Sequence, residues 1–386
     1  MNSERRELTM DSHASRIGYP RSRDALANSA LHEQATTLPR GDIGWLLQLS
    51  REPAKVVAYH RHLCKCLLNT TATLFAVDHR THMIRSSTLG QLVIKLDRNE
   101  LEGALRAFPG YVPCPYLRVL RRYATAFAID HSWQLKMCYS REQAQLICDV
   151  LNRVTASLVK RLKEAGTFEK NFRRGGNKNF TKFIKNMEKC LSGRKTVQVM
   201  RFDAHIGEIR QERQSLVYRN ELAKLPRFLD WKAQLQEYLN FRYRDALLGF
   251  AWRLELGASR SWHLHYLVLL EPSLHPDGAF EIDDIAETWH SLTDGEGEIF
   301  NVNKDRAGGY KSSCLGIIET SDMRALRGLV NVAAYFTLPD LYLRLVLPGG
   351  NTFGEGKFRS LEGRRIPNWQ AVKLPVDTVS SRFSAF

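Results

Sequence analysis

Two apolar runs separated by a short turn constrain the fold of this chain more than any other feature of its sequence. The runs occupy residues 247–256 and 262–270, and the five residues between them are Gly257-Ala-Ser-Arg-Ser261. Apolar runs of this length, joined by a turn that contains glycine and serine, predict a β-hairpin. Successive side chains of a strand point to opposite faces, so His263 and His265 share one face of the second strand.

The length of the turn decides whether Glu255 lies beside the two histidines. With five residues in the turn, Leu256 pairs with Trp262 and Glu255 pairs with His263, which places the glutamate on the face that carries both histidines. A bulge or a slip of one residue would move the glutamate to the opposite face. The alternative for Glu255 is a surface carboxylate that pairs with Arg253 or Arg260.

The residue types at these positions suit a divalent metal ion. Histidine is a common metal ligand, and one carboxylate oxygen with two imidazole nitrogens can hold Mg²⁺ or Mn²⁺ while leaving coordination positions open. Such an ion acts as a Lewis acid on a phosphate group. The alternative is that the two histidines are ordinary surface residues of a strand. The sequence therefore makes Glu255, His263 and His265 candidate metal ligands.

A tyrosine in a later helical segment is a candidate nucleophile. Residues 323–336 have helical spacing, and Tyr335 lies near the end of this segment. A tyrosine hydroxyl that attacks a phosphate beside the metal would form a covalent phosphotyrosyl intermediate, which conserves the bond energy for later rejoining. Tyr342 is a second candidate, and each tyrosine has the alternative of a simple packing role.

The charge balance of the chain favours a polyanionic partner. Its formal net charge is +15 and its pI is about 9.6, which point first to nucleic acid and second to an anionic membrane surface. No apolar run reaches the roughly 18–20 residues of a membrane-spanning helix, and the first residues lack the apolar core of a secretory signal. The seven scattered cysteines indicate reduced thiols. We therefore expect a cytoplasmic protein with no membrane partner.

Much of the positive charge lies in residues 160–195, where twelve basic and three acidic residues give a net charge of +9. Phe172, Phe180 and Phe183 are interleaved with these cations. Cations along a nucleic-acid backbone and aromatic rings for base stacking are what single-stranded DNA binding requires. Gly175-Gly176-Asn177 interrupts the segment and predicts a flexible linker followed by a helix, and the alternative is a solvated linker that only joins two domains. The residues that we expect to contact DNA are Arg173, Arg174, Lys178, Lys182, Lys185 and Lys189.

The order of the expected elements indicates an α+β fold. Residues 41–165 have the spacing of a helical domain, whereas residues 196–345 combine strands and helices around the hairpin, which predicts a central antiparallel sheet flanked by helices. Residues 166–195 form the basic linker or helix between them. Residues 1–40 are expected to be a disordered arm, and residues 346–386 a loosely structured basic tail. The other expected elements are strands at 197–206 and 315–319 and helices at 231–243, 283–292 and 323–336.

A series of landmarks occurs in order between Lys195 and Phe358. The landmarks are Val199-Met-Arg201-Phe-Asp203, Gly249-Phe-Ala-Trp252-Arg-Leu-Glu255, Trp262-His263-Leu-His265, residues 285–289, Gly316-Ile-Ile, Val332-Ala-Ala-Tyr335 and Phe353-Gly-Glu-Gly356. This series resembles the inovirus (filamentous phage) gene-2-product family, whose domain also occurs in YagK/YfjJ-type prophage proteins. The hairpin is similar to the HUH endonuclease core of rolling-circle Rep proteins, in which a glutamate about this far upstream joins two histidines at the metal. The resemblance implies an HUH/Rep-like domain that initiates phage DNA replication in the cytoplasm of a bacterial host. Arg201 and Asp203 match the family's opening strand, and the default expectation for this pair is a structural salt bridge.

One position departs from the family pattern. The family usually has Tyr-Leu-Thr-Lys around the tyrosine, whereas this chain has Tyr335-Phe-Thr-Leu338. A lysine three residues after the tyrosine would lie about one helical turn further on, near the metal and the phosphate, and leucine cannot replace its charge. Lys304, Lys311 or Arg344 is a candidate substitute from elsewhere in the chain.

Together, these observations predict a replication initiator that nicks one DNA strand through Tyr335 and leaves a 5′-phosphotyrosyl bond and a free 3′-hydroxyl. Its expected partners are single-stranded or origin DNA, with host replication proteins as candidates for the helical N-terminal half. Two alternatives remain. In the first, the missing lysine marks a catalytically decayed prophage protein of the same fold that binds DNA or regulates. In the second, the chain is an RNA-processing or ribosome-associated protein, which the charge alone supports.

Overall fold

The structure of the chain is a computed structural model that describes most of residues 44–361. The residues omitted within this span are 95, 97, 109, 125–139, 208–213, 258–261, 276, 305–313 and 349. The expected arm at 1–40, most of the expected tail at 346–386 and Lys311 therefore lie outside the described residues.

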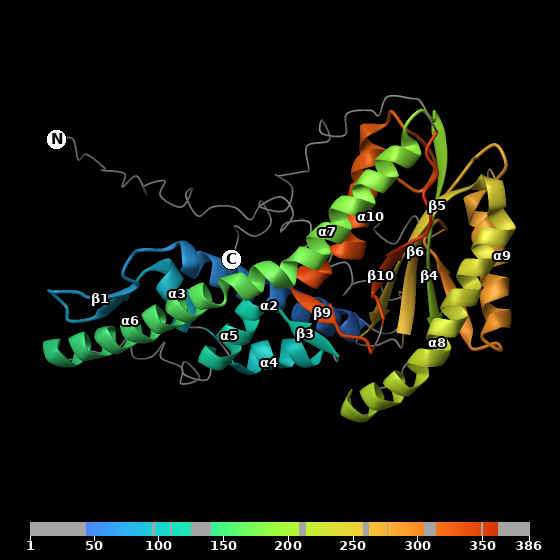
Figure 1. The fold of residues 1–386 in the computed structure, drawn as a ribbon. Coiled ribbons are helices and arrows are strands. Elements are labelled where there is room, and N and C mark those ends of the chain that lie inside the picture. Colours follow the sequence, from blue (N-terminus) through green and yellow to red (C-terminus); the bar gives the residue numbers. More distant parts are fainter. Residues whose placement is uncertain are drawn as a thin grey trace, which may run out of the picture.

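A six-stranded antiparallel sheet forms the centre of the structure (Figure 1). Its strands are β4 (Thr196–Ile206), β5 (Leu247–Leu256), β6 (Trp262–Leu270), β7 (Gly297–Asn301), β8 (Gly316–Glu319) and β10 (Phe353–Glu355). They lie in the order β10-β5-β6-β4-β7, and β8 pairs with the other end of β4. Because β4 is long, it holds β7 along residues 202–206 and β8 along residues 196–199. The expected α+β fold with an antiparallel sheet is confirmed.

One face of the sheet is apolar and lies against two helices. Phe202, Trp262 and Tyr266 are fully buried on this face. They belong to the same apolar cluster as residues of α8 (Gln214–Tyr243) and α9 (Gly278–Leu292), which cover this side in Figure 1. Alternation along β6 explains this face, because every second residue of this strand, from Trp262 to Leu270, is large and apolar.

The opposite face lies against α7 (Gly166–Leu191) and α10 (Met323–Thr337) and changes character along its length (Figure 1). Leu267 and Leu269 of β6 pack in one apolar cluster with residues of both helices. Toward the hairpin turn, the same row of side chains continues with His265 and His263, and all four residues are buried. Polar groups are therefore buried at one end of this face, where they require partners.

A helical layer precedes the sheet and shares a core with α7 and α10. Its elements are α2 (Gly44–Asn69), β1 (Phe75–Val77), β2 (Ile84–Ser86), α3 (Thr88–Ile94), α4 (Arg98–Arg106), β3 (Tyr111–Pro113), α5 (Pro115–Ala124) and α6 (Arg141–Glu164). A buried ion pair of 2.8 Å joins Arg61 of α2 to Glu169 of α7. In addition, β3 pairs with β9 (Leu343–Leu345), which follows the short helix η4 (Pro339–Leu341) at the end of α10. The helical layer thus contacts the chain that follows Tyr335.

Several expected elements are present with shifted boundaries. The clearest difference is α8, which begins at Gln214 and continues through Pro226, whereas the sequence predicts a start at residue 231. A proline inside a helix removes one backbone hydrogen bond. The apolar stripe that includes Leu225, Phe228 and Leu235 is buried on both sides of the proline, and this packing sustains the longer helix.

The break expected at Gly175 and Gly176 is absent, because α7 runs through both glycines as one helix. A Cβ atom added to Gly176 would lie 2.9 Å from the carbonyl oxygen of Thr337 and 3.1 Å from Leu341 Cδ2. Gly176 therefore permits close approach of α7 to the end of α10 and to η4. It does not act as a flexible break in the helix.

Gly176→Ala is expected to lower the free energy of unfolding by about 1–3 kcal/mol, because the added methyl group overpacks a backbone contact. Gly175→Ala is the matched control, since its Cβ would meet only the end of Arg344 at 3.5 Å. Alanine at this exposed helical site should stabilise by about 0.5–1 kcal/mol. Chemical denaturation measures both, and equal effects of the two substitutions would contradict the close-packing explanation.

Candidate metal centre

The register of the hairpin brings the three candidate ligands together. Leu256 pairs with Trp262 and Glu255 pairs with His263, as the five-residue turn predicts. Within the described parts of the two strands, the only irregularity of the pairing lies between Leu247 and Gly249, far from the turn. The expectation that Glu255 shares a face with both histidines is therefore confirmed.

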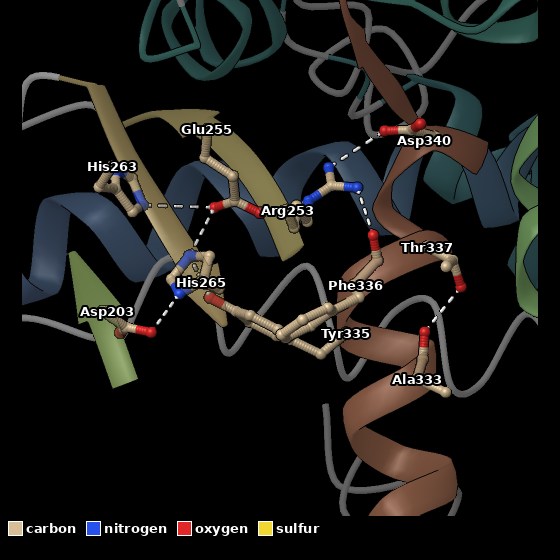
Figure 2. A network of polar contacts seen from close by, with 10 residues as sticks. All are labelled: Asp203, Arg253, Glu255, His263, His265, Ala333, Tyr335, Phe336, Thr337 and Asp340. Carbon is tan, nitrogen blue, oxygen red and sulfur yellow. Dashed lines mark hydrogen bonds and ion pairs between the residues drawn. The ribbon is translucent and has the colours of Figure 1, made fainter. Parts of the chain in front are cut away.

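The ligand atoms of Glu255, His263 and His265 point toward one another (Figure 2). Glu255 Oε2 lies 3.3 Å from His265 Nε2 and 3.6 Å from His263 Nε2, and the three ligand atoms all lie within 4.8 Å of one another. Atoms bound about 2.1 Å from a common ion lie roughly 3–3.5 Å apart. The three side chains are buried and could hold one metal ion, provided that the more widely separated ligand atoms move closer together.

Asp203 orients one of the two imidazoles. It lies opposite His265 in the β4–β6 pairing, and its Oδ1 atom is 2.6 Å from His265 Nδ1. A carboxylate that accepts the Nδ1 proton leaves Nε2 to act as the ligand atom, which is a common arrangement behind metal-binding histidines. The salt bridge with Arg201 expected from the sequence is therefore not the main contact of Asp203.

Arg253 holds the other oxygen of the glutamate. Its Nε atom donates to Glu255 Oε1 at 2.5 Å, while Nη1 donates to the Phe336 carbonyl oxygen at 2.7 Å and Nη2 to Asp340 Oδ1 at 3.0 Å. The arginine side chain is fully buried. The alternative expectation was a surface pair between Glu255 and an arginine. The glutamate does pair with Arg253, but both side chains are buried inside the site.

Burial and neighbouring charges act in opposite directions on the titratable groups. Burial raises the pKa of Glu255, but the charges of His265 and Arg253 outweigh it and hold this pKa well below its usual range. Burial lowers the pKa of His265, and the carboxylates of Asp203 and Glu255 outweigh it and raise the pKa. Burial also opposes ionisation of Asp203, yet the contact with His265 lowers the pKa of the aspartate to about 2. Both carboxylates are therefore ionised at neutral pH.

Tyr335 of α10 reaches the same cluster (Figure 2). Its hydroxyl oxygen lies 3.0 Å from His265 Nε2, and the Arg201 guanidinium lies 4.7 Å above the centre of its ring. The other tyrosine candidate lies elsewhere: the Tyr342 ring packs under Arg61, and its carbonyl oxygen accepts from the Cys114 backbone. Of the two tyrosines, only Tyr335 is close to the candidate metal ligands.

Neither of the two described candidates for replacing the missing lysine lies at the site, and the third, Lys311, falls outside the described residues. Lys304 pairs with Asp283 of α9, and the Arg344 guanidinium stacks on Phe172, 4.4 Å from the ring centre. Arg201 and Arg253 lie at the site instead, at 4.7 Å from the Tyr335 ring and 2.5 Å from Glu255 respectively. The sequence offers one signal that could have found both arginines. Arg201 lies two residues before Asp203 and Arg253 two residues before Glu255, so each arginine shares a strand face with an acidic residue.

The six basic residues of α7 that were expected to contact DNA divide into two groups. Arg174, Lys178, Lys182, Lys185 and Lys189 are exposed, and spacings of three and four residues place them along one side of the helix. Arg173 is half-buried on another side, and Lys182 also pairs with Glu355 at 2.8 Å. We call the five exposed residues the cationic face of α7.

The aromatic residues of α7 are not available for base stacking as the sequence predicts. Phe180 and Phe183 are buried in the apolar core, and Phe172 is half-buried beneath Arg344. They lie on the side of the helix that packs against the rest of the protein. The cationic face therefore offers charge without stacking from these three rings.

Comparison of the chain with protein-family models, with curated proteins and with solved structures finds no match in any of the three. Within the described part of the chain, no helix combines the length and the apolar character needed to cross a membrane. Any assignment of function therefore depends on the residues and geometry of the site itself.

The wild-type protein is expected to bind Mn²⁺ at this site, measured by isothermal titration calorimetry. Loss of a residue that only supports a metal ligand typically weakens binding by about 10–100-fold. Glu255→Gln, His263→Ala and His265→Ala should each weaken binding by more than this, because each removes a ligand. His290→Ala, at an exposed histidine of α9, is the control and should bind as wild type does. Unchanged affinity in all three ligand variants would place the ion elsewhere.

Proposed function

We propose that the chain is a metal-dependent endonuclease of the HUH type that nicks one strand of DNA through Tyr335. The observation that carries this proposal is the 3.0 Å separation between the Tyr335 hydroxyl and Nε2 of His265, a ligand atom of the candidate metal centre. A nucleophile must lie this close to the group that polarises the phosphate if the two are to act on the same atom.

The chain's own residues divide the work of such a reaction. When bound, Mg²⁺ or Mn²⁺ would act as a Lewis acid toward the scissile phosphate. The Tyr335 oxygen attacks phosphorus as the bond from phosphorus to the 3′-oxygen breaks. The phenol loses one proton and the departing 3′-oxygen gains one, so no further reactant is needed. The products are a 5′-phosphotyrosyl bond and a free 3′-hydroxyl.

The cationic face of α7 supports DNA as the partner. It presents five exposed cations on one helix, and the chain carries a net charge of +15. Charges spaced along a helix neutralise successive phosphates without reading the base sequence. Together with the resemblance to phage replication initiators, this charge favours single-stranded or origin DNA as the substrate and initiation of phage or prophage DNA replication as the role.

The burial of the site sets a condition on this function. Tyr335 and His265 are fully buried, and Glu255 and His263 are no more than 5% exposed. Tyr111 of β3 is a further tyrosine near the glutamate. Burial raises the pKa of its phenol, and the charge of Glu255 raises this pKa further. A phosphodiester reaches the metal centre only after the covering residues move, so the proposed reaction includes an opening step.

The same burial favours a second candidate function. A site closed to DNA, with Leu338 where the family has lysine, fits a catalytically decayed prophage protein of the same fold that binds DNA or regulates. In that protein, the polar cluster would serve the stability of the sheet, and DNA binding would be independent of metal.

A covalent-adduct assay distinguishes the two candidates. The protein is incubated with Mn²⁺ and labelled single strands tiled from the DNA around its own gene, and the products are separated under denaturing conditions. Wild type is expected to form a protein–DNA band that Tyr335→Phe abolishes, with DNA binding retained. Tyr342→Phe is the matched control, because it removes a hydroxyl from a buried tyrosine away from the metal ligands, and it should leave the band intact. Unchanged adduct formation by Tyr335→Phe would refute the assignment of the nucleophile, and the absence of any wild-type adduct beside salt-sensitive DNA binding would favour the second candidate.

Removal of charge from the cationic face is expected to weaken DNA binding and its salt dependence. Substitution of Lys178, Lys185 and Lys189 by glutamine should reduce the slope of log affinity against log salt concentration by about 0.7 for each phosphate of a single strand that is no longer neutralised. Titrations of a labelled oligonucleotide at several salt concentrations measure this slope.

The control removes three exposed cations from other elements, namely Arg80, Arg118 and Arg122, and therefore changes the net charge equally. If this control reduces the slope as much as the α7 variant, net charge governs binding and the cationic face has no special part.

A further inference from the structure

The Arg253 guanidinium joins three separate parts of the site (Figure 2). It donates to Glu255 Oε1 within its own strand β5, to the carbonyl oxygen of Phe336 in the last turn of α10, and to Asp340 Oδ1 in η4. The distances are 2.5, 2.7 and 3.0 Å, and the side chain has no exposed surface. Its strand therefore connects directly to the helix that carries Tyr335.

The first of these bonds determines which oxygen of Glu255 is free to bind an ion. Arg253 occupies Oε1, while Oε2 is the oxygen that faces His265 Nε2 at 3.3 Å and His263 Nε2 at 3.6 Å. Glu255 is consequently held so that it offers one oxygen beside the two imidazoles. Without the arginine, the carboxylate would be free to rotate and to lose this alignment.

The other two bonds hold the end of α10. The carbonyl of Phe336 is one of the last four of the helix, which have no partner within the helix itself. Arg253 satisfies this carbonyl, and Asp340 in the next element holds the second terminal nitrogen of the guanidinium. Because Phe336 directly follows Tyr335, these bonds set the position of the tyrosine relative to β5.

A guanidinium is the side chain suited to this arrangement. A fully buried cation is costly unless it is paired, and Arg253 has two carboxylates and one carbonyl as acceptors. Its planar fork directs donors to all three at once, whereas a lysine ammonium is a point charge on a flexible stem. An Arg253→Lys substitution therefore keeps the charge and removes the simultaneous alignment of the ligand and the helix.

We propose that Arg253 is a positioning residue that sets both the metal-binding geometry of Glu255 and the placement of Tyr335. Its effect on metal affinity acts through Glu255 and does not depend on the nicking function. Its effect on the covalent step acts through Phe336 and Asp340, and this part rests on the proposed function.

The test compares two full-length variants by Mn²⁺ titration and by the adduct assay at saturating Mn²⁺. Arg253→Lys is expected to weaken Mn²⁺ binding by about 10–100-fold, as for other outer partners. It should also slow adduct formation by about 100-fold, since a displacement near 1 Å has this effect. Asp340→Asn should keep near wild-type Mn²⁺ affinity and slow adduct formation alone, because it weakens only the helix side of the arrangement. If Arg253 only stabilised the fold, Mn²⁺ affinity and adduct formation would not respond differently in the Arg253→Lys and Asp340→Asn variants.

The matched control is Arg61→Lys. Arg61 is equally buried, and its guanidinium pairs with Glu169 at 2.8 Å through two nitrogens, away from the metal ligands. This variant should lose stability to heat and keep both Mn²⁺ affinity and adduct formation. If Arg253→Lys does not fold, the double variant Arg253→Gln with Asp340→Asn replaces it, because it removes one buried positive and one buried negative charge together.

Two results overturn the inference. Wild-type Mn²⁺ affinity in the folded Arg253 variant refutes the role in positioning Glu255. Equal loss of Mn²⁺ affinity in the Arg61 control shows that any buried defect has the same effect. A wild-type protein that binds Mn²⁺ and forms no adduct refutes the nicking proposal instead, and the Mn²⁺ titrations then decide the role of Arg253 on their own.

Discussion

The antiparallel pairing of β5 with β6 is the constraint on which the rest of the structure depends. It sets Glu255 opposite His263 and Arg253 opposite His265, so the candidate ligands and their cation share one face of the sheet. A slip of one residue in β5 would turn Glu255 and Arg253 toward the apolar layer beneath α8 and α9, away from the two histidines. Burial of unpaired charges costs several kcal/mol, so the polar cluster and the apolar layer specify the same register.

The cluster remains stable in the protein interior because its charges are paired. Asp203 and Glu255 share the imidazole of His265, and Arg253 lies between Glu255 and Asp340. Each contact explains the direction of a pKa shift, since the nearest opposite charge outweighs burial at both carboxylates and at the imidazole. The same pairing orients His265 Nε2 and one oxygen of the glutamate toward a common point, which is what a metal ion requires.

Helix α7 has a different role on each of its sides. Its buried side carries Phe183 and the close contact of Gly176 with the end of α10, and Glu169 binds Arg61 of the helical layer. Its exposed side carries the cationic face. A single helix thus connects the helical layer, the segment that bears Tyr335 and the exposed cationic face.

The sequence by itself determined the hairpin, its register and the shared face of its polar residues, because strand alternation and turn length are local properties of the chain. It also placed Tyr335 on a helix. Only the tertiary structure decided that this tyrosine and Asp203 both meet His265, since these contacts join residues 70 and 62 positions apart and depend on how α10 and β4 pack on β6. Packing likewise decided that Gly176 permits a close helix contact and that Phe183 lies in the core, because composition alone does not show which side of a helix faces the protein.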